Sequence, residues 1–303
     1  MTTPLVLKLG GELLEAPDAR ARIAACCAAL SRRRPLVGVH GGGRAVDAVR
    51  DRRGVAPNKI DGLRVTDAPT LDVVVSVLAG AANTALVASL VEAGAAAVGL
   101  TGVDAGLGQA TRSRAHVTAS GAVADLGFVG DPTDADPRLL QVLLGAGYVP
   151  VVASIGLERE APRALLNVNA DVMACRIAAA LGASLVIAGA TAGVFGADGQ
   201  TIASMTAADI DRLIADGTAT AGMIAKLSSC RAALDDGVPD VRIIDGRTLD
   251  ATHGPDSAPG THLRAPRSGG QGQRHEPTGR KQNESPEPRA KSVEPRAQSQ
   301  QRS

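Results

Sequence analysis

The sequence is poor in aromatic side chains. Its 303 residues include two phenylalanines, one tyrosine and no tryptophan, although 45% of the chain is hydrophobic. Stacking on nucleic-acid bases and caging of organic cations both need aromatic rings, so neither mode of recognition is expected. The core must be built from small aliphatic side chains instead, and the chain is long enough to bury a sizeable one.

Paired cysteines and membrane signals are also missing. The four cysteines, Cys26, Cys27, Cys175 and Cys230, form no C-x-x-C pair, which favours buried thiols in a reducing compartment over metal or disulfide roles. No charged region precedes the first apolar run, and by inspection no stretch reaches the ~18 apolar residues of a membrane span. We therefore expect a cytoplasmic protein without a membrane partner.

Strong charge of one sign is confined to the C-terminal segment. The net charge is +1, but residues 264–303 carry +5 and the remainder −4. A mildly acidic body argues against a nucleic-acid partner. The segment 264–303 is rich in Pro, Gln, Arg, Ser and Glu and has too few apolar residues to offset the entropy of ordering. We predict one domain over 1–263 and a disordered tail over 264–303.

The rest of the chain alternates short aliphatic runs with longer Ala/Leu-rich stretches. This pattern predicts an α/β fold, with a largely parallel sheet covered by helices on both faces. Strands are expected at Leu5–Leu9, Leu36–His40, Ala97–Leu100, Val149–Ala153, Leu185–Ala188 and Val241–Ile244. Helices are expected at Ala19–Arg32, Arg44–Arg53, Thr70–Ala93, Pro137–Ala146, Asp171–Leu181, Ala207–Ala215 and Ala221–Asp235. The Gly/Thr/Ser-rich segment 106–131 is typical of a hairpin that leaves the main sheet.

Two glycine-rich turns follow predicted strands. Lys8 ends one strand just before Gly10-Gly11, and Gly41-Gly42-Gly43 follow the strand that ends at His40. Bare amides between a strand and a helix can hold phosphate oxygens, and the helix dipole favours an anion there. Neither turn matches a dinucleotide fingerprint or a Walker loop. A tight turn or a flexible loop would explain each of them without function, and we interpret His40 as a structural histidine.

Three further motifs carry polar residues. Arg64, in GLRVTD, can bind a carboxylate through two hydrogen bonds, which a lysine could not do with the same geometry, and a surface arginine without a ligand is the alternative. In NVNAD, Asn167, Asn169 and Asp171 alternate on one side of an extended segment, and Asp171 can cap the following helix. Lys226 lies in the first turns of a helix after Gly222, where a lone lysine is normally solvated.

Together and in this order, the motifs resemble the amino-acid kinase family, and most closely its acetylglutamate kinase branch. The resemblance rests on KLGG, VHGGG, GLRVTD, the Ala79–Thr84 stretch, NVNAD, GMI-K and VRIIDGR, and it spans Leu5 to Leu263. It implies a three-layer αβα sandwich with a mainly parallel central sheet. About 1–170 would bind the acylated amino acid, and about 171–263 would bind ATP.

The resemblance also implies a reaction. The γ-phosphoryl group of ATP, with Mg²⁺ held mainly through ATP, would pass to the side-chain carboxylate of N-acetyl-L-glutamate in arginine biosynthesis. A glutamyl carboxylate has a reference pKa near ~4.3 and is already ionised at neutral pH, so no general base is needed. The transfer does need cations and N–H donors around the migrating group.

Residue roles follow from the same resemblance. Lys8 and Lys226 would stabilise the transition state, and Asp171 would orient both ammonium groups. Arg64 would bind the α-carboxylate of the acceptor, and Asn167 would hold its other end. The remaining implied positions are Gly42 and Gly43 for the acceptor, and Gly10, Gly11, Thr191, Gly193 and Gly222 for ATP. No residue is assigned to a metal.

Three positions depart from the family pattern. The stretch Gly189–Gly193 lacks the usual acid, and Ala221 stands where glycine or aspartate is frequent, so the adenosine contacts are in question. Arg44 replaces a common proline, without an explanation from sequence. The arginine-inhibited hexamers of the family carry an extra helix before the first strand. Because none is seen here, we expect a homodimer insensitive to arginine.

Two alternatives stay open. A kinase for N-acetyl-aminoadipate or carrier-linked aminoadipate in lysine biosynthesis would act on a substrate longer by one methylene, which is worth only ~1–3 kcal/mol of discrimination. A catalytically silent ligand-binding homologue would explain the altered nucleotide stretch, although Lys8, Lys226 and Asp171 are all retained.

Overall fold

An eight-stranded sheet forms the centre of the protein. The computed structural model describes residues 2–56, 59–60, 63–114, 116–118, 121–217 and 221–264. The strand order is β14-β16-β15-β13-β1-β2-β10-β5. Six strands from β5 to β15 run parallel, whereas β16 is antiparallel to β15 and β14 is parallel to β16. The bounds are β1 Leu5–Leu9, β2 Leu36–His40, β5 Ala97–Thr101, β10 Val149–Ala153, β13 Ser184–Gly189, β14 Ser204–Thr206, β15 Val241–Asp245 and β16 Gly260–Arg264.

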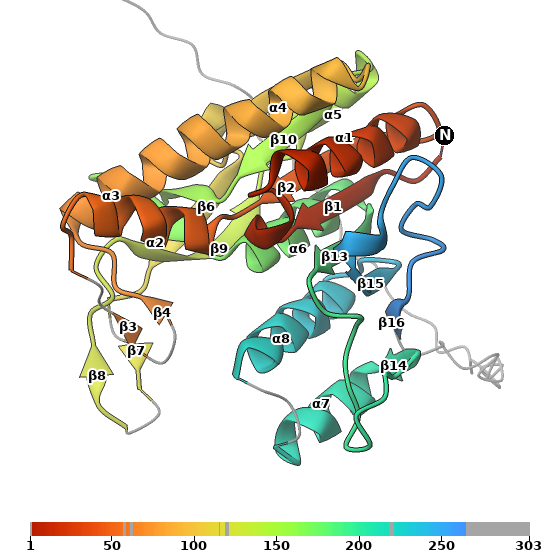
Figure 1. Cartoon of the computed structure of the whole chain (residues 1–303). Coiled ribbons are helices and arrows are strands. Elements are labelled where there is room, and N and C mark those ends of the chain that lie inside the picture. The colour runs from red at the N-terminus through yellow and green to blue at the C-terminus, as the bar shows by residue number, and fades with distance from the viewer. Residues whose placement is uncertain are drawn as a thin grey trace, which may run out of the picture. The chain divides into compact units, whose positions relative to one another are not determined.

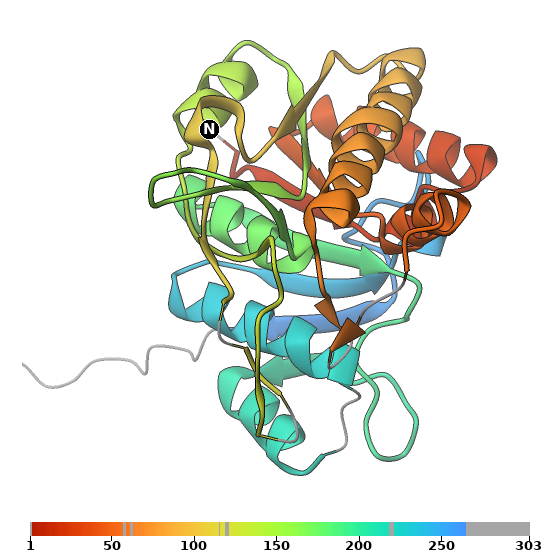
Figure 2. The same cartoon turned by 90° about the vertical axis from the view of Figure 1, so that its left-hand side faces the viewer.

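Helices cover both faces of this sheet, which confirms the predicted three-layer α/β class (Figures 1 and 2). The first core cluster joins the sheet to α6 and α8, and the second joins it to α1 and α4. Helices α2 and α3 belong to a third, smaller cluster. The bounds are α1 Pro17–Ser31, α2 Gly43–Arg52, α3 Ala68–Val75, α4 Asn83–Glu92, α5 Arg138–Gly145, α6 Ala170–Leu181, α7 Ala207–Ala215 and α8 Ala221–Asp235.

Strand β1 shows how the layers are encoded. Leu5, Leu7 and Leu9 pack in the cluster of α1 and α4, whereas Val6 packs in the cluster of α6 and α8. Because successive side chains of a strand point to opposite faces, Lys8 shares the face of Val6 and lies on the side of α6. Alternation along one strand therefore fixes the side of the sheet on which this cation lies.

One helical segment is longer and more apolar than expected. Helices α3 and α4 continue through a π-helical turn at Ser76–Ala82, so that residues 68–92 are helical throughout. By length and hydropathy this segment could cross a membrane, with a mean hydropathy of 2.0 and 39% of its most apolar window buried. The expectation that no stretch reaches span length is wrong here. A core helix of a soluble protein passes the same test, and the side chains of Val73, Val74 and Leu86 are fully buried in this structure.

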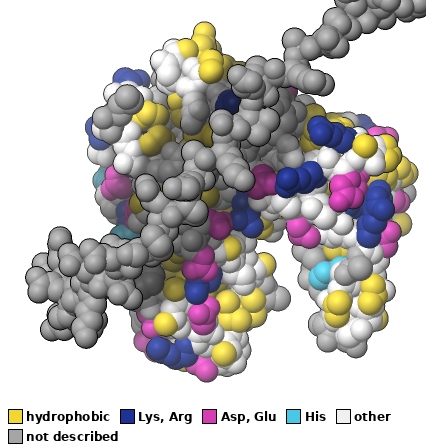
Figure 3. All heavy atoms as spheres, turned by 180° about the vertical axis from the view of Figure 1, so that it is seen from behind, with side chains coloured by type: hydrophobic (Ala, Val, Ile, Leu, Met, Phe, Trp, Pro, Cys, Tyr) yellow, Lys and Arg dark blue, Asp and Glu magenta, His cyan; other side chains and the backbone are white. Residues whose placement is uncertain are grey.

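The excursion predicted at 106–131 contains antiparallel pairs. Strand β6 (Gly108–Arg112) pairs with β9 (Val129–Ala135), and the two close a small barrel with β11 (Ile155–Glu158) and β12 (Leu165–Val168). Between them, β7 (His116–Val117) pairs with β8 (Val123–Ala124). Hydrophobic side chains lie over the arm that carries this hairpin (Figure 3). Val117 and Val123 of the hairpin are exposed. A second pair is formed by β3 (Lys59–Ile60) and β4 (Leu63–Arg64).

The predicted strands and helices are all present, with bounds that differ by at most two residues. Of the strands in the central sheet, β14 and β16 were missed because neither forms an apolar run: their sequences are SMT and GTHLR. Strand β16 ends at Arg264, so the tail begins at least one residue later than predicted. Apart from Arg264, the tail residues predicted to be disordered lie outside the described part of the chain.

All four cysteines are buried and free, as expected. Burial raises the pKa of Cys26 to about 11 and that of Cys175 to about 12, and nearby negative charge adds to both shifts. Thiols with such pKa values are almost fully protonated at neutral pH and are poor nucleophiles.

Candidate active site

Two glycine loops meet at the carboxyl ends of β1 and β2. Strand β1 pairs with β2 on one side and with β13 on the other, so the strand order reverses at β1, and ligands of open α/β sheets bind at such a point. A Cβ atom on Gly11 would lie 2.6 Å from Cα of Gly42, and one on Gly42 would lie 2.9 Å from Cδ2 of Leu78. Gly11 must therefore be glycine for the two loops to touch, and Gly42 leaves room for the Leu78 side chain.

A largely buried triad of charges lies at the same edge. The Nζ atom of Lys8 is 2.8 Å from Oδ1 of Asp171, and Nζ of Lys226 is 3.9 Å from Oδ2. The three side chains are 11%, 17% and 14% exposed, in the order Lys8, Lys226 and Asp171, so solvent screens their charges only weakly. Burial by itself would raise the pKa of Asp171, but the two ammonium groups outweigh it and lower that pKa below its ordinary value.

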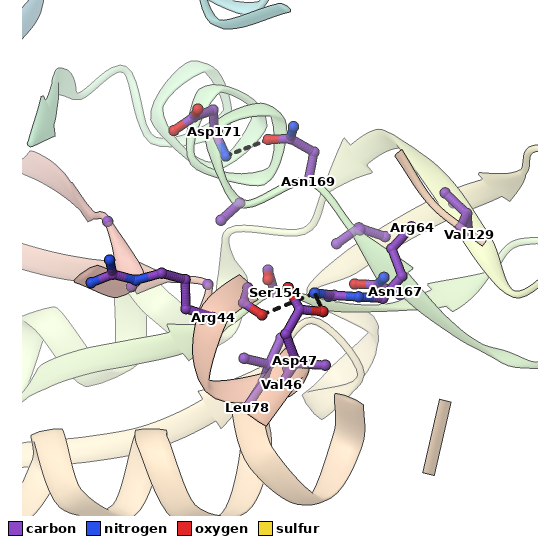
Figure 4. A pocket seen from close by; sticks show the side chains of 18 of the residues that line it. Arg44, Val46, Asp47, Arg64, Leu78, Val129, Ser154, Asn167, Asn169 and Asp171 are labelled. Atoms are coloured by element: carbon purple, nitrogen blue, oxygen red, sulfur yellow. Dashed lines mark hydrogen bonds and ion pairs between the residues drawn. The ribbon is translucent and has the colours of Figure 1, made fainter. Parts of the chain in front are cut away.

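The start of α6 explains why Asp171 is available to the lysines. Asn169 is the N-cap, and its Oδ1 accepts hydrogen bonds from the backbone N–H groups of Asp171 at 2.8 Å and Val172 at 3.3 Å. The prediction that Asp171 itself caps the helix is therefore wrong. Figure 4 shows the contact from Asn169 to the Asp171 backbone. Because Asn169 satisfies the helix end, the carboxylate of Asp171 is left to pair with Lys8 and Lys226.

A cavity of about 560 Å³ opens beside this triad. Most residues predicted for the site line it, namely Lys8, Gly10, Gly11, Gly42, Gly43, Arg64, Asn167 and Asp171. Sequence reasoning missed other lining residues with polar or charged side chains, among them Glu12, Arg44, Asp47, Ser113, His116, Asp131 and Ser154. Lys226 is not part of the lining and approaches the site through its contact with Asp171.

Arg64 reaches the cavity from β4 and is held at one end of its guanidinium group (Figure 4). Its Nη2 donates to Oδ1 of Asp47 at 2.6 Å and to the carbonyl oxygen of Gly43 at 2.9 Å. Its Nε is buried and has no hydrogen-bond partner among the described residues. Nearby, Nδ2 of Asn167 donates to Oγ1 of Thr66 at 3.1 Å. This part of the cavity is thus built from side chains with defined partners.

The residues predicted for the nucleotide are arranged differently. Thr191, Gly193 and Gly222 do not line the cavity. Gly193 has a φ of +107°, and a Cβ atom on it would lie 2.6 Å from Oγ1 of Thr261, so packing alone requires glycine there. In the stretch that lacks the usual acid, the backbone N–H of Ala190 donates to Oε1 of Glu12 at 3.1 Å. A carboxylate therefore does lie beside Ala190, contributed by the loop after β1.

Two other polar residues find explanations in the structure. Arg44 forms a two-pronged contact with Glu15, with Nε–Oε1 and Nη2–Oε2 distances of 2.9 and 2.7 Å. It therefore ties the start of α2 to the segment before α1. His40 is fully buried, and its Nε2 lies 3.1 Å from Nδ2 of Asn83. Burial lowers the pKa of His40 despite an opposing contact with the Gly41 carbonyl, which agrees with a structural, neutral histidine.

The described part of the chain contains no group of three or more His, Cys, Asp or Glu side chains that could hold a metal ion. Asp171 is engaged by two lysines, and Glu12 accepts a backbone N–H. These side chains do not form a permanent metal site, but they suit a cation that arrives bound to an anionic ligand. In nucleotide sites Mg²⁺ needs only one or two carboxylates, because phosphate oxygens and water supply its other ligands.

Comparisons with known proteins point to one family. A sequence profile of the amino acid kinase family matches residues 3–245. The chain is 42% identical over 222 residues to an acetylglutamate kinase of Acidiphilium cryptum, which covers 72% of this chain and 73% of the relative. It is 38% identical over 254 residues to an acetylglutamate kinase of Parvibaculum lavamentivorans, covering 82% and 83% of the two chains.

A solved structure of similar fold agrees with this family. The structure of N-acetylglutamate synthase from Neisseria gonorrhoeae, complexed with coenzyme A and N-acetyl-glutamate, superposes with a TM-score of 0.73 at 25% identity. The match covers 86% of this chain and spans 59% of that synthase chain. With a family profile over most of its length and relatives near 40% identity, the chain belongs to the amino acid kinase family.

Proposed function

We propose that the protein is an acetylglutamate kinase, which transfers the γ-phosphoryl group of ATP to the side-chain carboxylate of N-acetyl-L-glutamate in arginine biosynthesis. The observation that carries the proposal is the largely buried Lys8–Asp171–Lys226 triad beside two glycine loops. The names of relatives about 40% identical support the choice of acceptor.

The chemistry needs no general base. An ionised carboxylate oxygen of the acceptor attacks the γ-phosphorus, the bond from that phosphorus to the β,γ-bridging oxygen breaks, and ADP leaves with the electron pair. No proton moves in this step, because a glutamyl carboxylate with a pKa near ~4.3 is already ionised. His40, which ends β2, is buried and neutral and is not needed as a base.

Lys8 and Lys226 act on the migrating group. As the phosphoryl group leaves ADP, negative charge spreads over its oxygens, and fixed cations in a poorly solvated site stabilise that charge. Asp171 orients both ammonium groups and offsets the repulsion between them. The residues come from β1, α6 and α8, so the reaction depends on three separate elements of the fold.

The acceptor is bound in the cavity of about 560 Å³. Arg64 pairs with the α-carboxylate, and its unpartnered Nε supports this role because a buried N–H group favours a ligand that accepts from it. Asn167 holds the acylated end. The N–H groups of Gly42 and Gly43, at the start of α2, bind the carboxylate that is phosphorylated, where the helix dipole also favours an anion.

ATP is bound mainly through backbone groups. Gly10 and Gly11 contact its phosphates, while Thr191, Gly193 and Gly222 form part of the adenosine side. Mg²⁺ would arrive with ATP and would neutralise negative charge on the phosphates as the bond breaks. Among the described residues, Glu12 is the carboxylate closest to Gly10, because a Cβ atom at Gly10 would clash with its Oε1.

The active form is a cytoplasmic homodimer without a nucleic-acid or membrane partner. The long segment 68–92 supports the dimer, because one side of it is exposed although the segment is strongly apolar. Exposed positions recur about every four residues, at Asp72, Ser76, Gly80, Thr84, Ala88 and Glu92, with Ala81 and Val91 also exposed, and those between Asp72 and Val91 are small. Small residues at this spacing let two helices approach closely, and burial of the face against a second copy would remove its apolar surface from water.

An acyl-phosphate assay tests the proposed function. Purified protein is incubated with MgATP, hydroxylamine and one acceptor at a time: N-acetyl-L-glutamate, N-acetyl-aminoadipate, free glutamate and N-acetyl-aspartate. We expect ATP-dependent hydroxamate formation with acetylglutamate at the highest kcat/KM. Preference for acetylaminoadipate would move the protein to lysine biosynthesis. Binding of acetylglutamate without turnover of any acceptor would identify a silent homologue.

A further inference from the structure

The carboxylate of Asp47 links two arginines beside the acceptor cavity. Its Oδ1 lies 2.6 Å from Nη2 of Arg64 and 2.9 Å from Nη1 of Arg50. Asp47 lies in α2, one helical turn before Arg50, whereas Arg64 belongs to the separate strand β4. The side chains of Arg50 and Arg64 are only 5% and 13% exposed, so both contacts lie where solvent screening is weak.

Arg64 uses only part of its hydrogen-bonding capacity within the protein. Nη2 donates to Asp47 and to the Gly43 carbonyl, whereas Nε is buried without a partner in the described part of the chain. A buried N–H group without an acceptor is unfavourable, and an anionic ligand in the cavity would relieve that penalty. The contacts at Nη2 fix the plane of the guanidinium group, and therefore the direction in which Nε–H points.

Arg50 fixes Asp47 in turn. It is almost fully buried, and besides Asp47 it contacts the exposed Asp51, with an Nη2–Oδ1 distance of 3.0 Å. A carboxylate between two arginines is held from both sides, and it also reduces the repulsion between the two cations. Truncation of Asp47 would leave two poorly solvated guanidinium groups near each other, and Arg64 would lose its side-chain anchor.

We infer that Asp47 is a positioning residue for the acceptor: it holds Nη2 of Arg64 so that Nε–H faces the α-carboxylate of the acylated amino acid. Arg50 supports it from behind. The inference rests on the proposed function, because it takes Arg64 as the ligand of that carboxylate. Asp47 acts through Arg64, and its effect should therefore fall on binding of the acceptor and leave ATP binding unchanged.

The test compares Asp47→Asn, Asp47→Glu and the control Asp51→Asn in the full-length enzyme. We expect Asp47→Asn to raise KM for acetylglutamate by about 10- to 100-fold, the range for loss of one charge-assisted hydrogen bond, with KM for ATP within about twofold. Asp47→Glu should fall between Asp47→Asn and wild type. Asp51 contacts the same Arg50 but is 63% exposed, and Asp51→Asn should change neither KM by more than about twofold.

A double-variant cycle separates positioning from a general structural role. If Asp47 acts through Arg64, then Asp47→Asn combined with Arg64→Lys should raise KM for acetylglutamate no further than Arg64→Lys alone. Additive effects, an unchanged KM in Asp47→Asn, or an equal rise in KM for ATP would overturn the inference. If Asp47→Asn does not fold, Asp47→Glu decides alone. We then expect the KM for acetylglutamate to rise at least about threefold while the KM for ATP stays unchanged. A wild-type KM for acetylglutamate in Asp47→Glu would overturn the inference.

The same measurements distinguish failure of the positioning role of Asp47 from failure of the proposed kinase function. A wild-type enzyme that never phosphorylates acetylglutamate would overturn the proposed function. Wild-type turnover combined with an unaltered acceptor KM in the Asp47 variants would overturn only the positioning role.

Discussion

The two halves of the site are held by different kinds of contact. On the acceptor side, Arg64 and Asn167 are fixed by the side chains of Asp47 and Thr66. On the nucleotide side, the N–H of Ala190 is held by Glu12, a residue of the opposite loop, and Gly193 is fixed by packing on Thr261. The difference suggests that side chains select the acceptor, whereas backbone groups receive the nucleotide.

The largest effect on turnover is expected at Lys8 and Lys226, between the acceptor side and the nucleotide side of the proposed site. Lys8→Ala and Lys226→Ala should each lower kcat by roughly 100- to 1,000-fold or more, because each removes one cation from the transition state. Both variants should keep the wild-type circular dichroism spectrum, and KM for either substrate should change much less than kcat. Turnover near the wild-type rate in one variant would show that this lysine is not at the reacting group.

A smaller effect should separate the nucleotide side from the acceptor side. Glu12→Ala removes the acceptor of the Ala190 N–H group, and loss of one such bond corresponds to about fivefold in affinity. We expect KM for ATP to rise by that order, with KM for acetylglutamate unchanged. Asp47→Asn is the matched control, since it should show the opposite pattern. A rise in the acceptor KM alone in Glu12→Ala would contradict the proposed division of the site.

The acceptor side should also lose stability in acid. Burial lowers the pKa of His40 in the folded protein, so below pH ~6.5 the unfolded chain binds a proton that the native state does not. The free energy of unfolding should then fall by up to ~1.4 kcal/mol per pH unit for this group. Urea unfolding at pH 7.5 and 5.5 measures the loss, which His40→Asn should reduce. His253→Asn, which alters an exposed histidine, should leave the loss in place.

The smallest effect is expected at the exposed pair of Arg44 and Glu15, which lies at the rim of the cavity. These side chains are 72% and 36% exposed, and such pairs contribute little because water and salt screen them. Arg44→Ala should leave the melting temperature and both KM values within experimental error. A clear rise in KM for ATP would mean that Arg44 contacts the nucleotide and that the nucleotide side uses more side chains than we propose.

Sequence patterns predicted the parts of the molecule that depend on local periodicity. Strand β1, strand β2 and helix α7 have the predicted bounds because aliphatic runs and helical spacing fix them without long-range information. The meeting of Lys8 with Asp171 was inferred from family resemblance. Strand alternation, read with the observed packing, then accounts for the face on which Lys8 lies.

Other features depend on contacts between distant segments. The contacts of Asp47 with Arg64 and of Glu12 with Ala190 join residues 17 and 178 positions apart, and no local pattern marks them. The capping of α6 was misassigned because Asn169 and Asp171 are both good N-cap residues. The two residues are distinguished only by the contacts of Asp171 with Lys8 and Lys226, which leave Asn169 to cap the helix.

The central claim is that Lys8 and Lys226 act together on the transferred phosphoryl group. The most direct test is calorimetric binding of ADP with aluminium fluoride, a planar analogue of that group, in the presence of Mg²⁺ and acetylglutamate. Affinity for the analogue should fall in Lys8→Ala and Lys226→Ala about as much as kcat, while affinity for acetylglutamate alone stays near wild type. Tight binding of the analogue by either variant would contradict the account.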